Sequence, residues 1–111
     1  MGGFVKGDVV TILFRFSDLK NATPRPALVL ADLHGQDVIL CQITKKCPHL
    51  DLGIELTEYS FQGDPLRVIP SYVRPVSLFT AENSLIREKI TSLASDKLQE
   101  VYNLLNSLFS I

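Results

Sequence analysis

The 111-residue sequence has no tryptophan, only two cysteines and no long hydrophobic run. Two cysteines, Cys41 and Cys47, are too few for a disulfide framework, and unpaired thiols are typical of a reducing cytoplasm. No apolar stretch approaches the length that spans a bilayer, and the first residues lack the apolar centre of a signal peptide. We therefore expect a cytoplasmic protein without a membrane partner.

Metal-binding side chains are also scarce. Besides the two cysteines the sequence has only two histidines, His34 and His49. The spacing of these residues matches no zinc signature, and Cys41 stands where a buried strand residue is expected. The sequence therefore favours a protein that has no metal site and no cofactor.

Net charge is close to zero, at −1, so total charge gives no argument for nucleic-acid binding. The charges are nevertheless segregated along the chain. Residues 15–25 and 39–50 are both basic in balance, whereas residues 51–66 contain four acidic residues and no basic one. If the two basic segments meet in space, they form a patch that attracts anions.

The length predicts a single domain over residues 1–111. Periodicity and turn residues predict strands over residues 8–16, 25–32 and 37–44, short strands over 54–61 and 66–69, and a strand over 71–79. Pro75 in the last of these indicates an edge position or a bulge. In the first strand, Val10, Ile12, Phe14 and Phe16 share an apolar face that is expected to point into the core.

Helices are expected only near the end of the chain. Thr80 is a candidate cap for a short helix over residues 81–90, and Ser95 for a final helix with Asp96 in its first turn. An apolar stripe at helical spacing indicates that the final helix packs on the sheet; it comprises Leu98, Val101, Tyr102, Leu105, Leu108 and Phe109. The expected fold class is mainly β, a barrel-like sheet closed by a C-terminal helix.

A strand register can be derived for the second and third strands. If residues 33–36 form the turn, with Gly35 in the unusual backbone conformation, paired residue numbers sum to 69 and Arg25 lies opposite Thr44. Opposed residues share a face, and a guanidinium beside a hydroxyl is a good receptor for phosphate. The alternative is structural: Arg25 pairs with Asp18 on the surface, and Thr44 is simply a strand former.

Several strings resemble the MazF/PemK toxin family in order and spacing over about residues 6–105. They are Lys6-Gly7-Asp8-Val9-Val10, Arg25-Pro26-Ala27-Leu28-Val29-Leu30, Ile43-Thr44, Ser71-Tyr72-Val73-Arg74, Leu78-Phe79-Thr80 and Ser84-Leu85-Ile86. The resemblance implies an SH3-like barrel of the MazF/CcdB type. It also implies a homodimer that cleaves single-stranded RNA without metal, and a cognate antitoxin protein that blocks the site.

In the family, the Arg of Arg-Pro and the Thr of Ile-Thr carry catalysis, which implies catalytic roles for Arg25 and Thr44. The expected products are a 2′,3′-cyclic phosphate and a 5′-hydroxyl. Contacts with RNA are expected from the neighbouring loops and strands, namely from Asp18, Lys20, Asn21, Thr23, Gln42, Lys45, Lys46 and Arg74.

The sequence also departs from the family pattern. Ala31 and Lys45 stand where relatives often have serine, and Arg15 replaces a frequent proline. Two other functions remain open: a non-catalytic barrel that binds without turnover, and a gyrase-inhibiting toxin of the CcdB type. Toxins of the second kind act through a tail that contains tryptophan, which this sequence lacks.

Overall fold

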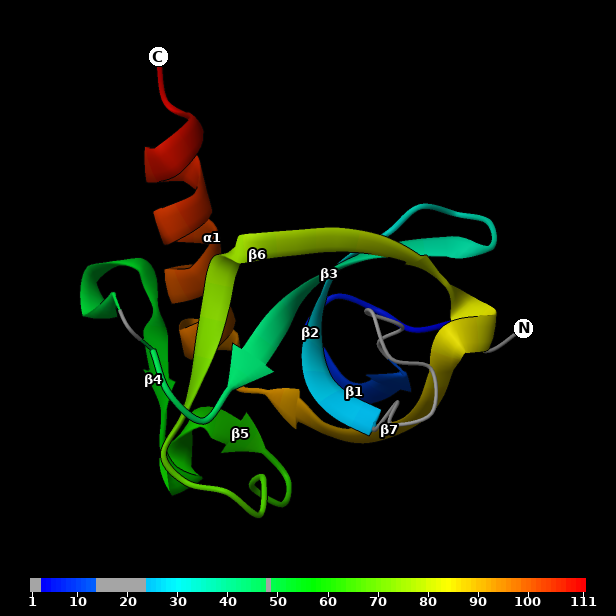
Figure 1. The fold of residues 1–111 in the computed structure, drawn as a ribbon, viewed down its shortest axis with the longest axis horizontal. Coiled ribbons are helices and arrows are strands. Elements are labelled where there is room, and N and C mark those ends of the chain that lie inside the picture. The colour runs from blue at the N-terminus through cyan, green and yellow to red at the C-terminus, as the bar shows by residue number, and fades with distance from the viewer. Residues whose placement is uncertain (1–2, 14–23, 48) are drawn as a thin grey trace.

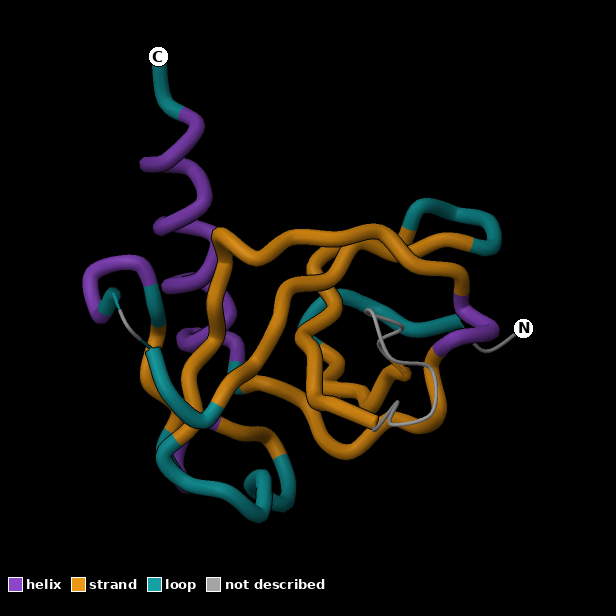
Figure 2. The backbone as a smooth tube through the Cα atoms, in the orientation of Figure 1, coloured by secondary structure: helices purple, strands orange, loops and turns teal. Residues whose placement is uncertain are grey.

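The computed structural model describes residues 3–13, 24–47 and 49–111, and the chain is mainly β (Figure 1). The strands of the described part form one antiparallel sheet in the order β4-β6-β3-β2-β1-β7-β5. Their bounds are β1 Asp8–Leu13, β2 Pro24–Asp32, β3 Asp37–Thr44, β4 Ile54–Leu56, β5 Phe61–Gln62, β6 Ser71–Glu82 and β7 Ile86–Leu93. The sheet curls on itself, and helix α1 (Ser95–Phe109) stands beside the curl (Figures 1 and 2).

Curling gives the sheet an apolar cluster on each of its faces. Val10 and Ile12 of β1 join an inner cluster with Ala27, Val29 and Leu40, as the alternation in the first strand predicts. Phe14 and Phe16 lie outside the described residues. The opposite face of β1 is buried as well, because an outer cluster containing Val9, Leu28, Cys41 and Val101 lies between the sheet and α1.

The start of β1 is held in place by a glycine and a buried carboxylate. Gly7 has a φ of 96°, which favours glycine, and its backbone bonds to both Val29 and Leu93. Asp8, only 5% exposed, accepts a hydrogen bond from the Val5 N–H at 3.0 Å and pairs with Lys89 at 3.3 Å. The Lys6-Gly7-Asp8 string is therefore a structural element that ties β1 to its neighbours.

The predicted register of β2 and β3 is correct over part of the pair. Ala27 opposes Gln42 and Leu28 opposes Cys41, but a shift after Val29 places Ala31, not Leu30, opposite Ile39. The turn also differs, because His34 has the positive φ, 58°, that the sequence predicts for Gly35. The Asp32 carboxylate accepts a hydrogen bond from the His34 N–H at 3.0 Å, which helps hold this turn.

The short helix predicted over residues 81–90 is wrong. Strand β6 continues to Glu82, a single 3-10 turn (η4, Asn83–Leu85) follows, and β7 begins at Ile86. Thr80 is a strand residue opposite Ile39 and caps nothing. Pairing of β7 with β1, reinforced by the Asp8–Lys89 ion pair, outweighs the weak local preference for helix.

Pro75 lies at a bulge, the second of its two predicted settings. Cys41 pairs with Leu78 and the next residue of β3, Gln42, pairs with Arg74, so β6 carries the extra residues around Pro75. The side chain of Pro75 is fully buried. Strand β6 lies between β4 and β3, so it is not an edge strand of the sheet.

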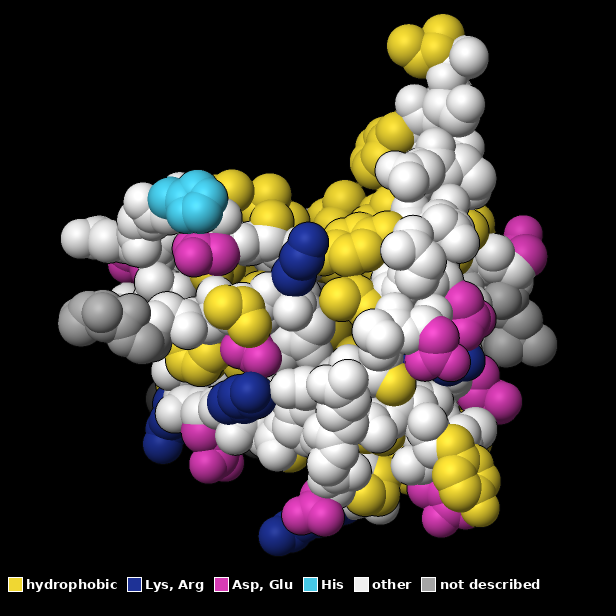
Figure 3. All heavy atoms as spheres, turned by 180° about the vertical axis from the view of Figure 1, so that it is seen from behind, with side chains coloured by type: hydrophobic (Ala, Val, Ile, Leu, Met, Phe, Trp, Pro, Cys, Tyr) yellow, Lys and Arg dark blue, Asp and Glu magenta, His cyan; other side chains and the backbone are white. Residues whose placement is uncertain are grey.

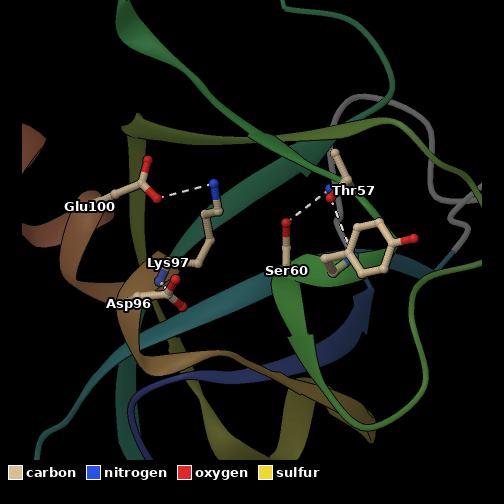
Figure 4. A network of polar contacts seen from close by, with 6 residues as sticks. Thr57, Ser60, Asp96, Lys97 and Glu100 are labelled. Carbon is tan, nitrogen blue, oxygen red and sulfur yellow. Dashed lines mark hydrogen bonds and ion pairs between the residues drawn. The ribbon is translucent and has the colours of Figure 1, made fainter.

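Residues 54–61 form less strand than predicted. At the start of this segment the strand is limited to β4. A 3-10 turn (η3, Glu58–Ser60) follows, with Thr57 as its cap. The Thr57 N–H donates to the Ser60 hydroxyl at 2.9 Å (Figure 4). The strand predicted over 66–69 is absent, and this segment is a loop with a cis Ile69–Pro70 bond.

Helix α1 is close to its prediction, although its N-cap is Ala94 and not Ser95. Asp96 lies in the first turn, where its carboxylate accepts a hydrogen bond from the Lys97 N–H at 2.9 Å (Figure 4). The first part of the apolar stripe packs on the outer cluster, and the Tyr102 hydroxyl donates to the Leu30 carbonyl at 2.6 Å. The last part is exposed, with Phe109 at 69%, because the helix extends past the sheet (Figures 1 and 3). No helix within the described ranges is long and apolar enough to cross a membrane.

Candidate functional site

A cleft of about 760 Å³ lies where the start of β2 and the end of β3 meet. Strands β2 and β3 contribute Arg25, Pro26 and residues 42–44, and the segment after β3 contributes Lys45 and Lys46. The remaining walls come from Thr11 of β1, from Glu88 and Ile90 of β7, from residues 66–68 of the loop before β6, and from Ser71 at the start of β6. Segments far apart in the sequence thus meet around one concave surface.

Arg25 and Thr44, the two residues expected to be catalytic, both line this cleft. Arg25 is exposed at the second position of β2, and Thr44 is the last residue of β3. The Thr44 hydroxyl donates to the carbonyl oxygen of Lys46 at 2.6 Å, and so closes the backbone after β3. The lone pairs of the Thr44 hydroxyl oxygen can still accept a hydrogen bond from a ligand. To donate to a ligand instead, the hydroxyl must first give up its hydrogen bond to the Lys46 carbonyl.

Basic side chains dominate the charge of the cleft. Lys45 and Lys46, expected to contact RNA, line it beside Arg25, and so does Arg67. Sequence reasoning misses Arg67, because it predicts a strand over residues 66–69 and not a loop that closes the cleft. The prolines that flank this segment, Pro65 and Pro70, are the signal that could have indicated a loop. Among the described residues that line the cleft, four are basic and one, Glu88, is acidic, which makes this surface attractive to anions.

The remaining residues expected to bind RNA have different outcomes. Gln42 lines the cleft, with its side-chain oxygen accepting a hydrogen bond from Ser77 at 3.2 Å. Arg74 pairs with Gln42 across β3 and β6 but is not among the cleft-lining residues. The loop residues lie outside the described part of the chain; they are Asp18, Lys20, Asn21 and Thr23.

The cysteines and histidines do not gather at the cleft. Cys41 is buried under α1, and this burial raises the pKa of its thiol to about 12, so the thiol stays protonated. Cys47 donates to the His49 carbonyl at 3.1 Å. In the ranges that the structure describes, no three His, Cys, Asp or Glu side chains are placed to hold a metal ion.

A second hollow, of about 660 Å³, lies at the opposite end of β2. It is lined by Lys6, Asp32, His34 and Tyr102 together with apolar residues of β2 and of the N-terminal segment. Asp32 and Tyr102 are already engaged in the hydrogen bonds that hold the turn and the helix. Of the residues that the structure describes, fewer basic groups line this hollow than line the cleft, and none of them is an arginine.

Known structures with the same fold cover nearly the whole chain. An endoribonuclease from mycobacterial species is similar with a TM-score of 0.75 and 16% identity, over 100% of this chain and 95% of that one. A mycobacterial endoribonuclease in complex with its cognate antitoxin gives 0.74 and 16% identity, over 100% and 97%. The MazE-MazF complex of Deinococcus radiodurans gives 0.74 and 20% identity, over 96% of each chain.

Comparison of the sequence with protein families identifies the family of this chain. No curated protein sequence matches this chain. Residues 5–109, however, match the family described as PemK-like, MazF-like toxin of type II toxin-antitoxin system. That match spans β1 to the end of α1 and includes all the described residues that line the cleft. The chain therefore belongs to the PemK-like, MazF-like toxins of type II toxin-antitoxin systems.

Proposed function

We propose that this chain is an endoribonuclease toxin that cleaves single-stranded RNA in the cleft between β2 and β3. The observation that supports this most is the placement of Arg25 and Thr44 beside Lys45, Lys46 and Arg67 on one concave surface. Such a surface attracts a polyanion and offers a guanidinium and a hydroxyl to one phosphate. Single strands fit this use because their bases are accessible, whereas paired bases are stacked.

The proposed reaction uses the nucleophile that RNA itself carries. The 2′-oxygen attacks the adjacent phosphorus while the bond from phosphorus to the 5′-oxygen breaks. The 2′-hydroxyl loses a proton and the leaving 5′-oxygen gains one, giving a 2′,3′-cyclic phosphate and a 5′-hydroxyl. Arg25 stabilises the charge of the phosphorane and donates a proton to the leaving 5′-oxygen, and Thr44 orients a phosphate oxygen.

We propose that the reaction needs no metal ion. Its nucleophile is internal to the substrate, and the charge that develops on phosphate is matched by Arg25 and the neighbouring lysines. The cleft-lining residues in the described ranges are basic or neutral apart from Glu88, a poor set of ligands for a divalent cation. Cleavage is therefore expected to persist in excess EDTA.

The partners follow from the same proposal. Solved relatives are described as an endoribonuclease with its cognate antitoxin and as a MazE-MazF complex. We propose that this chain acts in the cytoplasm as a homodimer and is neutralised by an antitoxin segment that occupies the cleft. An acidic segment would suit the basic lining of the cleft.

Incubation of the purified chain with single-stranded and duplex RNA in EDTA tests the proposal. Cutting of the single strand with cyclic phosphate ends is the expected result, and Arg25→Ala should slow it about 10²–10³-fold in a protein that still melts cooperatively. RNA binding without cutting would instead identify a non-catalytic binding module. Stabilised gyrase–DNA cleavage complexes in place of RNA fragments would identify a gyrase poison.

A further inference from the structure

Three cleft residues form one row across three strands. Thr11 of β1 is paired directly with Pro26 of β2 on one side and with Glu88 of β7 on the other. All three line the cleft, as expected for opposed residues, which share a face of the sheet. Arg25 adjoins Pro26, so the row runs from the carboxylate of Glu88 toward the basic end of the cleft.

The row sets the distance between the negative charge of Glu88 and the positive charge of Arg25. Neighbouring strands lie about 4.8 Å apart, so the backbones at Glu88 and Pro26 are about 10 Å apart. In a nucleotide whose phosphate lies at Arg25 and Thr44, the distance from the phosphate to the far edge of the base is of the same order as this separation. The base would pass Thr11 and Ile90 and bring its outer edge toward Glu88.

Glu88 is otherwise out of place in this cleft, because a carboxylate repels RNA phosphates. It is exposed, and the hydrogen bonds and ion pairs found in the described ranges do not engage its carboxylate. The next residue, Lys89, is already paired with Asp8. Ile90 and Val68, which are 39% and 43% exposed, supply apolar surface on which a base can pack.

We propose that Glu88 recognises a guanine base of the RNA bound in the cleft, an inference that rests on the proposed nuclease function. The Watson–Crick edge of guanine presents two adjacent donors, the N1–H and the 2-amino group. An ionised carboxylate has two acceptor oxygens and no donor, so it matches this edge with two charge-assisted hydrogen bonds. The other bases place an acceptor next to their donor, and a carboxylate repels that acceptor.

Cleavage of a random single-stranded RNA pool provides the first test. The wild-type protein is expected to cut with guanine enriched at one fixed position relative to the cut. Glu88→Gln is expected to cut the same pool without that enrichment, since an amide offers a donor where guanine needs an acceptor. The control is Glu82→Gln, which removes the same charge at the end of β6 remote from the cleft, opposite Asp37, and should preserve the wild-type pattern.

Binding to an uncleavable RNA isolates recognition from catalysis. The probe carries a 2′-deoxy sugar at the scissile nucleotide and either guanosine or inosine at the enriched position. Inosine differs from guanosine only in lacking the 2-amino group. Wild-type protein is expected to bind the inosine probe about tenfold more weakly, as for loss of one hydrogen bond to a charged group. Glu88→Gln should bind both probes equally, and Glu82→Gln should keep the tenfold difference.

Three outcomes would overturn the assignment of Glu88. If wild-type cuts RNA with no guanine preference, or if Glu88→Gln keeps the full preference, Glu88 does not recognise guanine, although the nuclease function stands. If the wild-type protein neither cuts nor binds any RNA of the pool, the proposed function fails and the role of Glu88 fails with it.

Discussion

The two ends of the β2–β3 pair use polar residues in opposite ways. At the turn end, Asp32 accepts a hydrogen bond from the His34 N–H, and the backbone of Asn83 bonds to that of Gln36 at 2.6 Å. At the cleft end, the cationic groups of Arg25 and Lys45 take part in none of the ion pairs found in the described ranges. Polar groups thus complete the structure at the turn end, whereas the cationic groups of Arg25 and Lys45 are not engaged by those ion pairs at the cleft end.

The largest expected effect comes from removing the guanidinium at the cleft end. Arg25→Ala should lower the RNA cleavage rate by about 10²–10³, as for loss of one group that stabilises transition-state charge. Arg25→Lys should recover little, because an ammonium does not reproduce the planar fork. Arg87→Ala, at an exposed site of β7 that does not line the cleft, is the matched control and should cleave normally.

Single-turnover cleavage measured beside thermal melting checks this. Normal cleavage by a folded Arg25→Ala variant would show that Arg25 has no role in catalysis. The two ends of the β2–β3 pair would then not differ in function as described.

A smaller loss is expected at Thr44. Thr44→Val removes the hydroxyl that donates to Lys46 and should slow cleavage about tenfold, the effect of about 1.4 kcal/mol. Thr44→Ser keeps the hydroxyl and should stay close to wild type. If Thr44 and Arg25 hold the same phosphate, the double variant should lose less than the product of the single losses. Strict multiplicativity in a double-mutant cycle would show that the two residues act independently.

Substituting the other basic residues of the cleft should weaken RNA binding more than it slows cleavage. Lys45→Ala, Lys46→Ala and Arg67→Ala should each flatten the salt dependence of single-strand binding, by about 0.7 in the slope of log K against log salt for each phosphate that the variant no longer neutralises. Lys6→Ala, in the hollow at the turn end, should leave the slope unchanged. Titrations of a 2′-deoxy-blocked RNA at several salt concentrations measure this, and equal slopes for all variants would place these residues outside the RNA path.

The smallest effect is expected at the turn end and should appear in stability alone. Asp32→Ala removes the acceptor of the His34 N–H and should lower the free energy of unfolding by about 1 kcal/mol. The cleavage rate at a temperature where the protein is folded should not change. Urea unfolding together with cleavage assays separates the two readouts, and a slowed reaction would mean that the turn end influences the cleft.

The sequence predicts the strands in which apolar and polar residues alternate strongly. It also predicts the site residues whose position follows from the pairing of β2 with β3. Residues 27–29 and 40–42 pair as derived. The pairing of Arg25 with Thr44 stays a prediction from residue spacing, and both residues line the cleft. Strand β7 is predicted wrongly as a helix because its exposed middle, residues 87–90, has no apolar alternation. Its strand state depends on pairing with β1, a contact between distant parts of the chain that local patterns do not encode.

The cleft itself is only partly predictable. Lys45 and Lys46 follow directly from the end of β3, so the sequence places them near Thr44. Arg67 and Glu88 reach the cleft through a loop and a strand where local patterns predict other elements. Arg74 is predicted from its place in a family-like string; it lies opposite Gln42, just before the bulge at Pro75, and does not line the cleft.

The register shift between Val29 and Ala31 has a practical consequence for labelling this protein. The shift separates the pairing near the turn from the pairing near the cleft, so a change in turn length need not slide the strands at their other end. His34 and Gly35 are exposed at the tip of that turn. A short epitope or a fluorescent label inserted between them should therefore report on binding or assembly while leaving the geometry around Arg25 and Thr44 intact.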